Sequence, residues 1–164
     1  MSDLRRNIYE IANAIAERLS STASTISVAE SCTGGAIASS LCAISGASGW
    51  FDTGIVAYTY ESKKNQLNIP QSILDKGLVT RETAEAMAIN VRSLSSTVFS
   101  IATTGVCGPT ENEGHAPCYV WIAVASADGV YSYLYQSTDA GREQNILSTT
   151  EASLTLLLSI INKQ

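Results

Sequence analysis

Four stretches of the chain place apolar residues every three to four positions, which is the spacing of a helix with one buried face. We predict helices over residues 3–19, over 33–44, after Thr80 as N-cap and at the C-terminus, with shorter helical segments at 61–68 and after Pro70. The residues expected to be buried are Leu4, Ile8, Ile11, Ala12, Ile15 and Leu19 in the first helix, Ala84, Met87, Ala88, Val91 and Leu94 after Thr80, and Ile146, Thr150, Leu154, Leu157, Leu158 and Ile161 in the last helix.

Five shorter apolar segments favour β-strands, because they are rich in β-branched and aromatic residues and are bounded by turn-forming residues. They cover residues 25–29, 51–60, 97–103, 119–126 and 130–136. The last two flank Asp128-Gly129, a strong signal for a tight hairpin. Two segments rich in turn-forming residues are expected to be loops, 45–49 and 104–117.

Helices that alternate with strands, together with one hairpin, indicate an α/β fold. We predict a three-layer α/β/α domain with a mixed central sheet that includes a C-terminal β-hairpin. The length of 164 residues is typical of one domain, so residues 1–164 are expected to form a single unit. Ligands of such sheets usually bind outside the strand ends. Ser31, after the first strand, and Thr104 and Gly105, after the third, are therefore expected to face one cleft.

Composition supports a packed core and removes several classes of function. The chain is 45% hydrophobic and 15% charged, which disfavours disorder. Its net charge of -5 and its scattered Lys and Arg residues argue against a nucleic-acid-binding surface. The N-terminal residues lack the apolar segment of a signal peptide, and the apolar runs are too short to span a membrane. We expect a cytoplasmic protein whose partners include neither nucleic acid nor membrane.

The four cysteines, Cys32, Cys42, Cys107 and Cys118, form no C-x-x-C pair and have no metal-site spacing. An even number permits disulfides, but a chain of this size does not need them to hold its core. Free thiols in a reducing compartment are therefore the expected state. We expect neither a metal ion nor a cofactor, because no His, Cys and Asp cluster has the spacing of ligands.

The segment 27–35 reads Ser-Val-Ala-Glu-Ser-Cys-Thr-Gly-Gly and passes from a buried strand into small hydroxyl, thiol and glycine residues. Ser31 and Thr33 supply hydroxyls, and Cys32 supplies a thiol. Gly34 and Gly35 allow backbone N–H groups to approach a ligand closely. Ser31 is the favoured nucleophile, and Cys32 is the rival to it.

A hydroxyl nucleophile needs a base to accept its proton. His115 is the one histidine and lies in a polar loop segment, so a Ser–His–Asp triad is poorly supported. Lysine can serve instead when burial lowers its pKa from about 10.4. Lys63 and Lys64 follow the second strand and are both candidates. Adjacent lysines are more often exposed surface residues, and composition does not choose between them.

Six segments, in order along the chain, resemble signature sequences of the CinA C-terminal domain family. They are Ala-Glu-Ser-Cys-Thr-Gly-Gly at 29–35, Gly-Ala-Ser-Gly-Trp-Phe at 46–51, Val-Ala-Tyr with Glu-Ser-Lys at 56–63, the helix at 79–88, Thr-Thr-Gly-Val-Cys-Gly-Pro at 103–109 and Gly-Arg-Glu at 141–143. The fifth resembles the family's Val-Thr-Gly-Ile-Ala-Gly-Pro, with cysteine in place of alanine. The resemblance covers nearly the entire chain. Larger family members carry an additional N-terminal domain, which we expect to be absent here.

The resemblance implies hydrolysis of nicotinamide mononucleotide to nicotinate mononucleotide and ammonia, without a metal or cofactor. It implies Ser31 as the nucleophile, Lys63 as the base and Tyr58 as the residue that orients this pair by hydrogen bonding. The family also suggests a homodimer.

The resemblance further assigns substrate-binding roles. Thr33, Gly34 and Gly35 would supply backbone donors near the developing oxyanion. Thr104 and Gly105 would line the opposite wall. Arg142 would bind the nucleotide phosphate, although a structural ion pair explains this arginine equally well.

The chain departs from the family pattern where the phosphate is expected. The family's Gly-Pro-Gly-Gly becomes Gly-Pro-Thr-Glu-Asn-Glu at 108–113, which removes two glycines and adds Glu111 and Glu113. The family's Lys-Pro-Val-Gly-Thr-Val becomes Ala-Pro-Cys-Tyr-Val at 116–120, and its second arginine in the last helix is Ile146. These changes remove positive charge or backbone access. The alternative is thus a divergent, weakly active or inactive homologue that binds a nucleotide or another small molecule.

Overall fold

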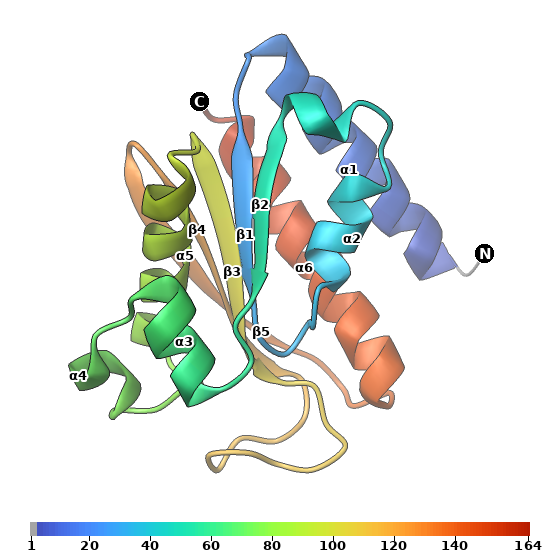
Figure 1. Ribbon diagram of the computed structural model, residues 1–164. Helices are drawn as coiled ribbons and strands as arrows, with labels where there is room; N and C mark the ends of the chain where they lie inside the picture. The colour runs from blue at the N-terminus through green and yellow to red at the C-terminus, as the bar shows by residue number, and fades with distance from the viewer. Residues whose placement is uncertain (1–2) are drawn as a thin grey trace.

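A computed structural model describes residues 3–164, which form a three-layer α/β/α fold around one mixed sheet, as predicted (Figure 1). The elements in chain order are α1 (Asp3–Ser21), β1 (Ile26–Glu30), α2 (Ala36–Cys42), a 3-10 turn (Ala47–Gly49), β2 (Phe51–Val56), α3 (Tyr60–Leu67), α4 (Gln71–Leu74), α5 (Arg81–Ser95), β3 (Phe99–Val106), β4 (Tyr119–Ser126), β5 (Gly129–Gln136) and α6 (Arg142–Ile161).

The sheet has the strand order β2-β1-β3-β4-β5. β1 is central and parallel to both β2 and β3, with Glu30 paired to Val56 on one side and to Thr103 on the other. β4 is antiparallel to β3, and β5 completes the predicted C-terminal hairpin. The carboxyl ends of the three parallel strands therefore lie at one edge of the sheet, where the cleft was expected.

Helices cover both faces of the sheet and enclose two apolar cores. α1, α2 and α6 pack on one face, and α5 with α3 and α4 lies on the other (Figure 1). In β1, Ile26 and Val28 belong to the core under α1 and α6, whereas Ala29 belongs to the core under α5. β1 is buried along its whole length, as expected of a parallel strand covered on both faces.

Several predicted boundaries were wrong at the end of the sheet that holds the cleft. β2 ends at Val56, so Tyr58 lies in a connection. α2 begins only at Ala36, and residues 31–35 form a turn. β3 continues through Thr104 and Gly105 to Val106, where a loop was predicted, because both residues pair with β4.

The predicted N-cap and the predicted buried faces of the helices agree with the structure, with one exception. Thr80 is the N-cap of α5, and its hydroxyl accepts a hydrogen bond from the Thr83 N–H. Leu94, predicted to be buried, lies in the last turn of this helix and is 51% exposed, so the buried face ends at Val91. Within residues 3–164 no helix is long and apolar enough to cross a membrane.

Candidate active site

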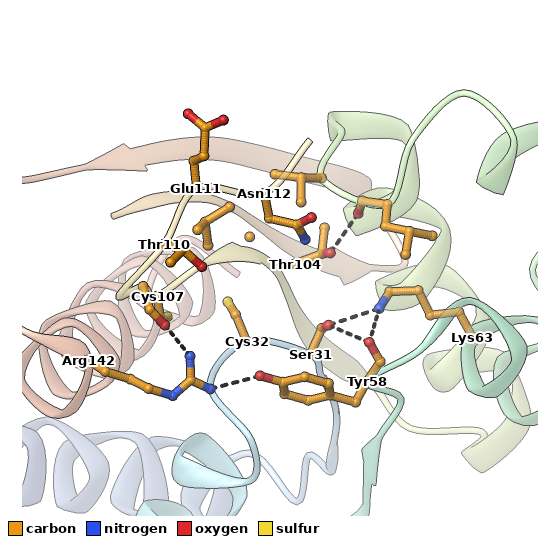
Figure 2. Close-up of a pocket in the computed structure, with 15 residues that line it drawn as sticks. Ser31, Cys32, Tyr58, Lys63, Thr104, Cys107, Thr110, Glu111, Asn112 and Arg142 are labelled. Atoms are coloured by element: carbon orange, nitrogen blue, oxygen red, sulfur yellow. Dashed lines mark hydrogen bonds between the residues drawn. The ribbon is translucent and has the colours of Figure 1, made fainter. Parts of the chain in front are cut away.

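A cavity of about 300 Å³ opens at the carboxyl ends of β1 and β3. Its wall contains Ser31 and Cys32 from the turn after β1, Tyr58 and Lys63 from the segment after β2, and residues 104–108 from the end of β3. Arg142, at the start of α6, closes one side (Figure 2). The structure thus brings together the two strand ends that the sequence analysis assigned to one cleft.

Ser31 and Lys63 are in direct contact in this cavity. The Lys63 Nζ donates a hydrogen bond to the Ser31 Oγ over 2.8 Å, and it also donates to the main-chain carbonyls of Ala57, at 2.9 Å, and Tyr58, at 3.2 Å (Figure 2). Three acceptors therefore surround the three N–H groups of the ammonium form. In the neutral amine, the two carbonyls hold two N–H groups, and the lone pair faces the Ser31 hydroxyl.

The start of α3 places Lys63 at the serine. Thr59 and Ser62 form a capping box, in which the Thr59 hydroxyl accepts from the Ser62 N–H and the Ser62 hydroxyl accepts from the Thr59 N–H. This box starts the helix at Tyr60 and turns Lys63 back toward the end of β2. Lys63 is 1% exposed, whereas Lys64 is exposed, so burial distinguishes two lysines that composition could not.

Burial lowers the pKa of Lys63 from 10.5 to about 8, because the low-dielectric surroundings disfavour the ammonium form. The negative charge of Glu113 opposes this shift. A pKa near 8 leaves a useful fraction of neutral amine close to neutral pH. Lys63 can therefore accept a proton under conditions in which an exposed lysine is fully charged.

The buried carboxylate of Glu30 shapes the turn that carries Ser31, and the sequence analysis assigned it no role. Its oxygens accept from the N–H groups of Gly35 at 3.1 Å, Ile37 at 3.1 Å and Ala38 at 2.8 Å. It thereby satisfies the first donors of α2. A charged residue at the end of an otherwise uncharged buried strand was the signal that could have identified it.

The predicted oxyanion donors Gly34 and Gly35 are occupied elsewhere, which corrects that expectation. The Gly34 N–H donates to the Ser31 carbonyl, and the Gly35 N–H donates to Glu30. Both glycines have positive φ, at 61° and 99°, so they provide the left-handed turn rather than ligand contacts. The hydroxyl of Thr33 is bonded to that of Thr103, at 2.8 Å, whereas the role of its main-chain N–H as an oxyanion donor stays a prediction.

Tyr58 contacts the pair through its main chain rather than its side chain. Its carbonyl accepts from Lys63 and, at 3.5 Å, from the Ser31 hydroxyl. Its phenol oxygen instead accepts from Arg142 Nη2 at 2.8 Å, while Arg142 Nη1 donates to the Gly108 carbonyl at 2.6 Å (Figure 2). Arg142 is thus held by neutral oxygens, and its remaining N–H groups can bind an anion in the cavity.

Thr104 and Gly105 line the same cavity as Ser31. The Thr104 hydroxyl donates to the Leu78 carbonyl at 2.6 Å, so it fastens the α4–α5 connection to β3. Gly105 has no room for a side chain, because an added Cβ would lie 2.5 Å from the Tyr119 carbonyl oxygen. The glycine therefore permits close approach of β4.

The altered loop after β3 does not direct the two new carboxylates into the cavity. Glu111 belongs to the cavity wall, but its carboxylate points away from Ser31 and Arg142 (Figure 2). Glu113 instead accepts from the N–H groups of Leu78 and Val79, at 2.9–3.0 Å, and so ties the loop to the α4–α5 connection. His115 is half-buried and stacks on Tyr119, with ring centroids 4.0 Å apart, and Ile146 packs against the core under α6.

Cys32 lies beside Ser31 but is poorly suited to act as the nucleophile. A hydrogen bond with the Cys107 thiol and burial raise its pKa well above the ordinary value, so the unreactive thiol form is favoured. All four cysteines are free, and only Cys42 is exposed. Within the part of the chain that the structure describes, no three His, Cys, Asp or Glu side chains gather as a metal site would require.

Comparison with known proteins gives consistent matches in sequence and structure. The CinA C-terminal domain family matches residues 8–161. A CinA-like protein of Shewanella loihica is 36% identical over 153 residues, which are 92% of this chain and 36% of that protein. A CinA-like protein of Shewanella denitrificans is 41% identical over 135 residues, or 81% of this chain and 32% of that protein. The chain thus spans about a third of the length of these curated relatives.

Solved structures of similar proteins have the same fold. The competence/damage inducible protein CihA of Agrobacterium tumefaciens superposes with a TM-score of 0.90 at 33% identity, over 95% of this chain and 96% of that one. A competence-damaged protein superfamily member of Escherichia coli gives 0.91 at 28% identity, over 98% and 93%. Because the family match covers almost every described element from α1 to α6, this chain belongs to the CinA C-terminal domain family.

Proposed function

We propose that the protein is an amidohydrolase that converts nicotinamide mononucleotide to nicotinate mononucleotide and ammonia, with Ser31 as nucleophile and Lys63 as base. The observation that carries this proposal is the 2.8 Å contact between the Lys63 Nζ and the Ser31 Oγ. A buried lysine held by two carbonyls against a serine in a cavity wall is the arrangement that makes a hydroxyl nucleophilic.

The reaction follows from the contacts of the two side chains. Neutral Lys63 accepts the Ser31 proton as the oxygen attacks the carboxamide carbon, and a tetrahedral intermediate forms. The resulting ammonium then protonates the leaving nitrogen, ammonia departs, and an acyl-serine ester remains. Lys63, neutral again, takes a proton from the water that attacks the ester carbonyl. The ester bond then breaks, the ammonium returns the proton to the Ser31 oxygen, and the acid is released and ionises to the carboxylate. Each proton leaves and returns through one nitrogen.

The substrate would lie between the Ser31 side of the cavity and Arg142. The Asn112 side chain lines the cavity, and its amide is a candidate donor to the oxyanion, since the glycine N–H groups are occupied. Arg142 would bind the phosphate with the N–H groups that it does not use for Gly108 and Tyr58. Glu111 also belongs to this wall, but its carboxylate points away from Arg142 and Ser31 (Figure 2).

Ammonia release from nicotinamide mononucleotide tests the proposal. We expect turnover by the natural chain, none with Ser31→Ala, and a loss of about 10²–10⁴-fold with Lys63→Ala. Lys64→Ala is the matched control, since Lys64 is adjacent but exposed. Equal activity of Ser31→Ala and the natural chain would contradict the proposal.

A second candidate is a non-catalytic nucleotide-binding protein on the same scaffold. It is favoured by the loop at 108–113, which lacks the family's glycines and places Glu111 in the cavity wall. This candidate predicts no ammonia release but a raised melting temperature with a pyridine or adenine nucleotide. No shift with a panel of such nucleotides would count against it.

A further inference from the structure

Two thiols that the proposed reaction does not use lie together in the cavity wall, next to the nucleophile. Cys32 follows Ser31 at the end of β1, and Cys107 follows β3. Both are buried, at 5% and 2% exposure, they belong to the same buried cluster, and each thiol shifts the pKa of the other. Figure 2 shows Cys32 between Ser31 and Arg142, and Cys107 above Arg142. They come from separate strands, and the cavity is their route to small molecules.

The surroundings make the two thiols unequal. Hydrogen bonds from Cys32 and Thr149, together with the charge of Arg142, lower the pKa of Cys107, whereas the same thiol contact and burial raise that of Cys32. Cys107 is therefore the more acidic thiol of the pair, and Cys32 is the less acidic one.

We propose that Cys32 and Cys107 are a peroxide-sensitive modification site, whose oxidation to a disulfide reversibly switches off the cavity beside Ser31. The Cys107 thiol loses its proton as its sulfur attacks one oxygen of hydrogen peroxide; the O–O bond breaks, the departing hydroxide takes up that proton as water, and sulfenic acid forms at Cys107. The Cys32 sulfur then attacks the sulfenic sulfur, its proton and the departing hydroxide leave as water, and the S–S bond closes. Two thiols and one peroxide thus give one disulfide and two waters.

The bond would change the geometry of the site at two points. Two sulfurs in a disulfide lie about 2.05 Å apart, closer than any hydrogen-bonded thiol pair, so the chain must shift at both ends. Cys32 is bonded covalently to Ser31, and Cys107 to Gly108, whose carbonyl holds Arg142. A displacement of about 1 Å at a reacting group can reduce the rate on the order of 10²-fold. Reduction of the disulfide would restore the geometry.

Mass spectrometry of the full chain after peroxide treatment tests this without reference to activity. We expect a loss of two hydrogens and a cross-link between the peptides containing Cys32 and Cys107. Chymotrypsin cleaves after Leu41 and so separates Cys32 from Cys42. A glutamate-specific protease cleaves after Glu111 or Glu113 and so separates Cys107 from Cys118. If the treated protein instead carries sulfinic acid at Cys107, oxidation at Cys42 only, or no change, the proposal is overturned.

Variants make the assignment independent of peptide mapping. Cys107→Ala, which installs the alanine of the family motif, must abolish the cross-link and leave Cys32 reduced. Cys42→Ser is the matched control and must form it normally, because Cys42 is exposed and outside the cavity. Where turnover is measurable, each protein is compared with its own untreated sample. Peroxide should then inactivate the natural chain on the order of 10²-fold and a thiol reductant should reverse this. Equal, reductant-reversible inactivation of Cys107→Ala would contradict the proposal.

Discussion

The Lys63 Nζ lies 2.8 Å from the Ser31 Oγ, although the two residues belong to different strand-to-helix segments. One backbone hydrogen bond joins these two segments, since the Ala57 N–H donates to the Glu30 carbonyl. A second bond fixes Ser31 against β3, since the Ser31 N–H donates to the Thr103 carbonyl. The contact therefore depends on the position of β1 between both of its neighbours.

The proposed reaction should depend on the protonation of Lys63. Only the neutral amine can accept the Ser31 proton, and burial lowers the Lys63 pKa to about 8. We therefore expect kcat/KM for ammonia release to rise with pH and to level off above about 8. Lys64→Ala should show the same profile, and Lys63→Arg should have no measurable activity, because a guanidinium stays charged. A profile that is flat from pH 6 to 9 would exclude Lys63 as the base.

The same buried amine should make stability depend on pH. In the unfolded chain Lys63 keeps its ordinary pKa of 10.5, so between about 8 and 10.5 the unfolded state binds more protons than the folded state. The contribution of Lys63 to the free energy of unfolding therefore rises with pH across this window, by up to about 3 kcal/mol. Urea unfolding of the natural chain and Lys63→Met from pH 7 to 10.5 measures this as the difference between the two curves. A constant difference would contradict the shift.

Glu30→Gln should destabilise the protein and weaken the site together. The amide keeps one acceptor oxygen and places an NH₂ group among the three N–H groups that the carboxylate now satisfies. We expect a loss of about 1–3 kcal/mol in the free energy of unfolding, measured in urea. Glu10→Gln, on the exposed face of α1, is the control and should change stability by less than about 0.5 kcal/mol.

Tyr58→Phe should separate the main-chain role of this residue from its side-chain role. The variant keeps the carbonyl that accepts from Lys63 and loses the phenol oxygen that accepts from Arg142. We expect kcat to change little. KM for the phosphorylated substrate should rise, because Arg142 loses one of the two oxygens that accept its hydrogen bonds. Steady-state kinetics of ammonia release gives both values. A large drop in kcat at unchanged KM would place the phenol in the chemical step instead.

Gly105→Ala should be strongly destabilising, because its Cβ would lie 2.5 Å from the Tyr119 carbonyl oxygen and 2.6 Å from the Val120 Cα. Backbone atoms of a central strand cannot yield as a flexible side chain does, so we expect a loss of about 1–3 kcal/mol or more. Gly49→Ala is the control, since nothing lies within 4 Å of an added Cβ there. Thermal unfolding of both variants measures the difference. Equal melting temperatures would show that β3 and β4 can separate at this point.

The elements of the fold were predictable because each is encoded by local spacing. The stripe over 3–19, the cap at Thr80 and the Asp128-Gly129 hairpin are confirmed by α1, α5 and the β4–β5 turn. The ends of β2 and β3 were not predictable, because a strand ends where the neighbouring strand stops forming hydrogen bonds with it. Thr104 and Gly105 belong to β3 only because β4 pairs with them.

The amino-acid sequence by itself determined the α/β class, the family and the residue types gathered near Ser31, because periodicity and motifs are properties of neighbouring positions. Only the tertiary structure decided which of the two lysines is buried, where the Gly34 and Gly35 N–H groups point, and that Cys32 faces Cys107. These properties depend on which backbone groups and charges surround a side chain. Residues far apart in the chain supply those surroundings, and the fold brings them together.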